Sequence, residues 1–159
     1  MQLAEASRRV ALLWSRVVRA RAWEHQRALA YPAGILAPPA LCAVCEAMTG
    51  VALDGHEIDW AELDADARFQ RAWVTDDAVG VLALSALRGF MMGAGETLSH
   101  FIVTHDACVE VESWWEDNIG ESERSDFVLR APDERALSSA AERFCAAWGA
   151  RGVSPLAPR

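Results

Sequence analysis

The first third of the chain has the hydrophobic spacing of α-helices. Over residues 3–29 apolar side chains recur every three or four positions, and Trp14 and Val18 widen this stripe. A Tyr-Pro-Ala-Gly sequence follows, and its proline is expected to end the helix. A second helix is predicted over residues 38–49, because two prolines open it and Gly50 follows it.

Two more helices are predicted in the middle of the chain. Asp59 and Glu62 have the spacing of a capping box, which predicts a helix over residues 60–73. Thr75 is then the expected cap of a helix that reaches residue 92. This segment is apolar nearly all round, so we expect it at the centre of the fold.

The hydrophobic pattern then changes to that of β-strands. Residues 97–103 and 108–115 are rich in β-branched and aromatic side chains and are joined by a Thr-His-Asp-Ala sequence, which predicts a β-hairpin. If its turn comprises residues 105–107, Thr104 faces Cys108, and His100 faces Glu112 across the hairpin.

The remaining elements are short, apart from one helix. We expect a polar acidic loop over residues 116–125, a third strand over 126–130 and a helix over 132–150. The apolar face of this helix is formed by Leu137, Ala140, Ala141, Phe144 and Trp148. Residues 153–159 are expected to form a loose tail.

These elements predict one α+β domain over residues 1–152. It would contain about five helices, with a long amphipathic one first and an apolar one at the centre, and a small antiparallel sheet of about three strands in the C-terminal half. A chain of 159 residues with 52% apolar content is within the range of a single domain.

Hydropathy bears on the compartment in which the chain works. No apolar stretch reaches the roughly 18 residues of a membrane span, and the first residues lack the apolar core of a signal peptide. We therefore expect a cytoplasmic protein whose four cysteines are reduced. All fifteen basic residues are arginine, which is typical of a GC-rich, bacterial genome.

Charge is distributed unevenly along the chain. Residues 1–27 contain six arginines and two glutamates, a balance of +4, and since the net charge is −8 the rest of the chain carries −12. The simpler interpretation is a basic helix that packs beside an acidic body. The alternative is that the acidic body meets a basic partner.

Residues 110–126 contain most of the features expected of such a contact. Seven acids and one arginine surround two adjacent tryptophans, and adjacent strand residues point to opposite faces, so one tryptophan is expected to be exposed. A solvated loop is the plain alternative. The candidate partner-binding residues are Trp114, Trp115, Glu116, Asp117, Glu121, Glu123 and Asp126.

We therefore expect a non-enzymatic domain that captures another protein, either by neutralising a toxin in the manner of an immunity protein or by docking an enzyme. No cofactor and no membrane contact are expected. Nucleic-acid binding is not expected either, since the total charge is strongly negative and lysine is absent. The wide apolar stripe of the amino-terminal helix must be covered either by the body of the same chain or by a second copy, and the second alternative is a homodimer through this helix.

The rival hypothesis is a small enzyme or metal-binding protein. It would use either His100, His105 and Glu112, or the Cys42 and Cys45 pair, whose residue types suit acid–base, redox or metal chemistry. A solvated ion pair and two buried apolar thiols are the structural alternatives. Since the chain has no known catalytic motif, we expect no catalytic residue.

Overall fold

The computed structural model describes residues 3–31, 38–57, 67–75, 78–90, 93–116 and 120–149. The elements along the chain are α1 (Leu3–Arg21), β1 (His25–Tyr31), α2 (Pro38–Thr49), β2 (Asp54–Glu57), β3 (Ala67–Val74), β4 (Gly80–Phe90), β5 (Gly93–Val103), β6 (Cys108–Glu116), β7 (Gly120–Ala131) and α3 (Glu134–Gly149).

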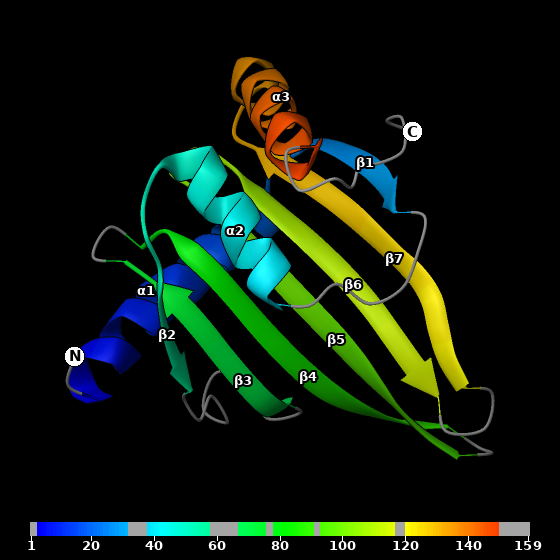
Figure 1. The fold of residues 1–159 in the computed structure, drawn as a ribbon. Helices are drawn as coiled ribbons and strands as arrows, with labels where there is room; N and C mark the ends of the chain where they lie inside the picture. The colour runs from blue at the N-terminus through cyan, green and yellow to red at the C-terminus, as the bar shows by residue number, and fades with distance from the viewer. Residues whose placement is uncertain are drawn as a thin grey trace.

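The described strands form one antiparallel sheet. Its seven strands lie in the order β1-β7-β6-β5-β4-β3-β2, so β1 and β2 are its two edges (Figure 1). Helix α1 packs on one face of the sheet, and α2 and α3 pack on the other. The expectation of about five helices and three strands is therefore wrong, although the mixed α+β class holds.

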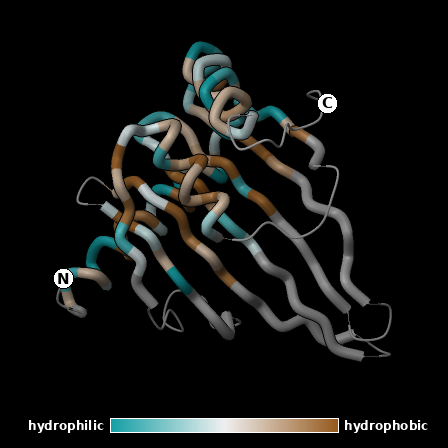
Figure 2. The backbone as a smooth tube through the Cα atoms, viewed as in Figure 1, coloured by the Kyte–Doolittle hydropathy of each residue, from teal (hydrophilic) through white to brown (hydrophobic). Residues whose placement is uncertain are grey.

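Each face of the sheet has its own hydrophobic core. On one face α1 buries Val10, Leu13 and Val17 against the sheet, while the opposite core contains buried residues of α2 and α3 such as Val44 and Phe144. Figure 2 shows hydrophobic stretches on the strands where these helices cover them. The sheet is thus the middle layer of three, and its central strands are buried on both sides where the helices cover them, as at residues 81–84 and 100–103.

The helix predicted up to residue 92 is in fact strand β4. Val81 belongs to the core under α2 and α3, and Leu82 belongs to the core under α1. Residues 80–84 are buried on both faces, so this part of the strand has no polar side and is as continuously apolar as a central helix.

The helix predicted over residues 60–73 is wrong over its second half, which forms β3. Ala72 and Val74 pack in the core under α1, whereas Trp73 packs against the opposite core. The alternation of these contacts is that of a strand. Residues 58–66, with Asp59 and Glu62 of the supposed capping box, lie outside the described part of the chain.

Helix α1 is shorter than the 27 residues predicted for it. It ends at Arg21. The Trp23 amide then donates a hydrogen bond of 3.0 Å to the Ala20 carbonyl, which closes a turn directly after the helix. The chain then enters β1, which buries Leu29 against β7. Pairing with β7 outweighs the helical spacing of this segment. Within α1, Val10, Leu13 and Val17 of the apolar stripe pack on the sheet of the same chain, whereas Val18 is exposed.

Other predictions hold more closely. Helix α2 spans the predicted residues and ends at Gly50, whose φ of 72° is the left-handed conformation of a helix stop. Helix α3 buries the predicted apolar face. Its first turn is capped by Asp133, whose Oδ1 accepts a bond of 2.8 Å from the Ala136 amide.

The predicted acidic loop and third strand are parts of β7. This strand begins at Gly120 and has 12 residues, so most of the expected loop pairs with β6 instead. Residues 117–119 and the predicted tail, residues 153–159, lie outside the described part of the chain.

Candidate functional site

The turn between β5 and β6 sets the register of the hairpin. The Thr104 amide donates a bond of 2.9 Å to the Ala107 carbonyl, so only His105 and Asp106 form the turn. Val103 therefore pairs with Cys108. The predicted pairing of Thr104 with Cys108 is wrong by one residue, and a one-residue shift moves every side chain to the other face relative to its partner.

This register separates the residues of the rival site. His100 pairs with Val111, and Glu112 pairs with Ser99. His105 is exposed in the turn, whereas His100 is only 4% exposed. The hairpin therefore does not bring His100 and Glu112 together as an acid–base pair.

His100 lies on the sheet face that carries α2 and α3, next to Ile102 of that core. Its Nδ1 has no hydrogen-bond partner among the residues that the structure describes, and burial lowers the pKa of the imidazole to about 4. The side chain is therefore neutral at pH 7. Neutral His100 contributes no positive charge to a binding or catalytic site. The sequence alone did not distinguish this buried histidine from a solvated one.

The two cysteines of α2 are poorly suited to redox exchange. Cys45 is buried and Cys42 is half-buried, and burial raises the pKa of each thiol to about 12. Glu46 adds to the effect on both. At neutral pH the reactive thiolate is thus a negligible fraction.

No group of three or more His, Cys, Asp or Glu side chains in the described part of the chain is arranged to hold a metal ion. No described helix combines the length and apolar character that crossing a membrane requires.

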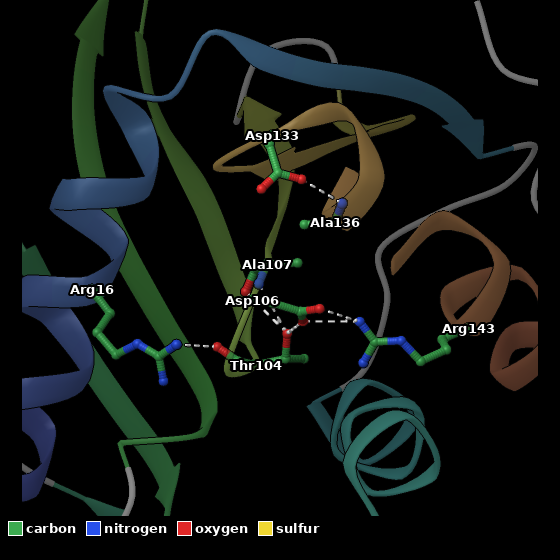
Figure 3. A network of polar contacts seen from close by, with 7 residues as sticks. All are labelled: Arg16, Thr104, Asp106, Ala107, Asp133, Ala136 and Arg143. Atoms are coloured by element: carbon green, nitrogen blue, oxygen red, sulfur yellow. Dashed lines mark hydrogen bonds and ion pairs between the residues drawn. The ribbon is translucent and has the colours of Figure 1, made fainter. Parts of the chain in front are cut away.

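A polar network at one end of the sheet connects α1 to two turns. The Arg16 guanidinium donates a bond of 2.7 Å to the Ala78 carbonyl in the β3–β4 turn. It donates another to the Thr104 carbonyl in the β5–β6 turn (Figure 3). Arg16 and Thr104 are 88 positions apart in the sequence, so no local pattern indicates this contact.

The same network reaches α3 on the other side of the sheet. Arg143 donates bonds of 2.8 and 3.0 Å to the two carboxylate oxygens of Asp106, and the Thr104 hydroxyl donates to the same carboxylate at 3.2 Å (Figure 3). Burial opposes ionisation of Asp106, but the bonds from Arg143 and Thr104 outweigh it and hold the pKa of the carboxyl below its usual value. One turn thus fixes both helical layers.

Replacing Arg16 with methionine is expected to lower the free energy of unfolding by about 2 kcal/mol, because two carbonyl groups lose their charged donor while the apolar stem remains. Arg19→Met is the matched control, since Arg19 is exposed on the same helix. Urea unfolding measures both variants. Equal stabilities of the two would show that the Arg16 bonds do not hold α1.

A second ionic cluster uses one of the predicted acids for the fold itself. Glu110 accepts bonds from Arg21 at 2.8 Å and from Arg130 at 3.1 Å. Arg21 also lies over the rings of Trp14 and Phe101. Glu110 is therefore neutralised within the protein and does not belong to a free acidic surface.

The other predicted acids lie in the hairpin that β6 and β7 form at the far end of the sheet, away from the β5–β6 turn (Figure 1). We call residues 112–116 and 120–126 the acidic hairpin. The structure describes its backbone pairing, whereas the side chains of the candidate residues, and all of Asp117, lie outside what it describes.

Pairing in the acidic hairpin brings acids and a tryptophan to neighbouring positions. Trp115 pairs with Glu121 of β7 on one side and with Glu96 of β5 on the other. Glu112 pairs with Asp126. Sequence reasoning had not included Glu96, because the predicted strand began at residue 97 and the predicted register placed residue 97, not residue 96, opposite residue 115.

No known protein family, curated protein or solved structure gives a significant match to the chain.

Proposed function

We propose that the protein is a non-enzymatic binding domain that captures a basic partner protein through the acidic hairpin. The partner is proposed to be either a toxin that is neutralised in the manner of an immunity complex or an enzyme that is docked, in both cases in the cytoplasm. The row of paired positions Glu96, Trp115 and Glu121 is the observation that carries this proposal.

The chemistry of this row favours an arginine side chain. Directly opposed residues on neighbouring strands have Cβ atoms roughly 5 Å apart, so the row places a tryptophan position between two glutamate positions. A guanidinium group stacks on aromatic rings and forms paired bonds with carboxylates. Tryptophan is also among the residues that most often contribute large binding energies at protein interfaces.

A second feature of the register supports a basic partner. Glu112 and Asp126 pair directly, and like charges at such positions destabilise a sheet. A nearby cationic surface would relieve this repulsion. β6 and β7 shift register between these two rows, but the pairing of β6 with β5 is regular there. Along β6, positions 112 and 115 are an odd number of residues apart, so the two rows belong to opposite faces of this strand. We therefore assign the direct contact to the Trp115 row and long-range attraction to the other acids.

Acid–base catalysis by His100 and Glu112 is disfavoured, because the register separates the two residues and burial keeps His100 neutral. The Cys42 and Cys45 thiols lack the low pKa that redox exchange requires.

Replacing Trp115 with alanine is expected to weaken partner binding by about 2 kcal/mol, or roughly thirtyfold in Kd, mainly through faster dissociation. The partner is first captured on immobilised wild-type protein from a cell extract and purified. Surface plasmon resonance then compares Trp115→Ala with Trp114→Ala, which removes the same side chain from the neighbouring position. Trp114→Ala is expected to change Kd less than threefold.

Capture of an acidic partner, or equal effects of the two tryptophan variants, would contradict the proposed contact. Thermal unfolding of each variant separates a loss of binding from a loss of fold. Any variant whose unfolding midpoint falls is replaced by the corresponding phenylalanine substitution.

A further inference from the structure

The two edge strands of the sheet differ in how they are protected. Strand β2 has only four residues, and two of them are the acids Asp54 and Glu57. Short length and charge are the usual means by which proteins prevent an edge from pairing with another chain. Strand β1 has seven residues and no acid, and all seven pair with β7 without a register shift.

The outer side of β1 carries backbone groups that no other described strand uses. In the described part of the chain β7 is the only neighbour of β1 in the sheet. An edge strand presents its outward amide and carbonyl groups as a template for another strand. The charge of Arg27 does not prevent this, because its guanidinium lies 3.8 Å from the Glu134 carboxylate and is only partly exposed.

We propose that the outer edge of β1 is a dimer interface that pairs with β1 of a second copy. A two-fold axis through the middle residue, Ala28, aligns all seven positions in antiparallel order. Ala28 then meets its own copy, Arg27 meets Leu29, Gln26 meets Ala30 and His25 meets Tyr31. No like charges are opposed in this register, and the small Ala28 side chains lie at the axis.

The sequence of β1 argues for a second copy over other occupants. A two-fold interface must be self-complementary, and the central Ala28 allows two copies to approach at the axis. In this register the basic residues of β1 do not face each other across the axis, whereas a basic partner strand would bring positive charges against Arg27. Pairing of one strand buries less area than most stable interfaces, so we expect a dimer that dissociates on dilution.

Net charge gives this dimer a salt dependence opposite to that of the proposed function. Two copies that each carry −8 repel each other, and salt screens this repulsion. Dimerisation should therefore strengthen with salt, while capture of a basic partner should weaken.

The test is sedimentation velocity of the full chain at several concentrations. The wild-type protein is expected to form dimers, and Ala28→Glu to weaken them about tenfold, because two carboxylates then meet at the axis. Ala28→Lys should have the same effect. An equimolar mixture of the two variants should recover dimers, since opposite charges then meet across β1.

Ala11→Glu is the matched control, because Ala11 is exposed on α1, the helix through which the alternative dimer would form. A monomeric wild type at about 100 μM overturns the proposal. The proposal is also overturned if Ala11→Glu loses the dimers while Ala28→Glu retains them. A mixture of the two Ala28 variants that stays monomeric overturns it as well. Thermal unfolding of the two Ala28 variants should match that of the wild type, and the recovery of dimers in the mixture itself requires both to be folded.

Discussion

Gly80→Ala should remove most of the stability of the protein, with a loss of at least about 4 kcal/mol in the free energy of unfolding. Gly80 is buried at the start of β4, where it pairs with Val74. A Cβ atom at this position would overlap the carbonyl oxygen of Trp73 and lie 3.0 Å from the Val74 Cα. Both neighbours are backbone, so neither is able to move without separating β3 from β4.

Gly149→Ala is the control for this substitution, because a Cβ atom there would meet nothing within 4 Å. We expect it to change stability by less than about 1 kcal/mol. Urea unfolding followed by circular dichroism measures both variants. A Gly80→Ala protein as stable as the wild type would show that β3 and β4 do not approach each other as described.

The second large effect is a loss of stability in acid that depends on His100. Its folded pKa of about 4 lies below the value of 6.5 in an unfolded chain, so the unfolded state binds the proton more readily. Stability from this residue is therefore complete above about pH 6.5 and is lost as the pH falls toward 4. The 2.5-unit difference corresponds to about 3 kcal/mol.

His100→Gln isolates this contribution, since glutamine does not titrate and the carboxylates remain the same. The difference in unfolding free energy between wild type and variant, measured by urea unfolding at pH 7 and pH 4, should change by about 3 kcal/mol in favour of the variant at low pH. His105→Gln, at the exposed turn position, should show much less change. An equal pH response in wild type and His100→Gln would mean that His100 is solvated.

The sequence predicted those elements whose two faces differ. In α1 and α3 one stripe is apolar and the other is polar, because each helix packs on a sheet with one side only. The hairpin of β5 and β6 was recognised by its β-branched residues and its polar turn. Helix α2 was delimited by two prolines and by Gly50.

Strands β3 and β4 were assigned to helices for a physical reason. Their neighbours, α1 on one side and α2 with α3 on the other, bury alternate residues in two different cores, so Val81 and Leu82 are both apolar. Local spacing does not distinguish such a strand from a buried helix. Only the order of the seven strands, a property of the whole chain, settles the assignment.

The candidate site was limited in the same way. Composition identified the acidic segment and its tryptophans, but the register between strands decides which residues meet. A two-residue turn instead of three separated His100 from Glu112, and the same shift in register placed Glu96 beside Trp115. The network of Arg16, Thr104 and Arg143 had no sequence signal, because its members belong to three separate elements.

The association rate with the captured partner tests the central claim most directly. It is measured at low and high salt for the wild type and for a variant in which Glu96, Glu121 and Glu123 are replaced by glutamine. The wild-type rate should fall about tenfold or more between 20 and about 500 mM salt, and the variant should associate more slowly at low salt with a flatter dependence. Identical rates and identical salt dependence in both proteins would contradict binding through the acidic hairpin.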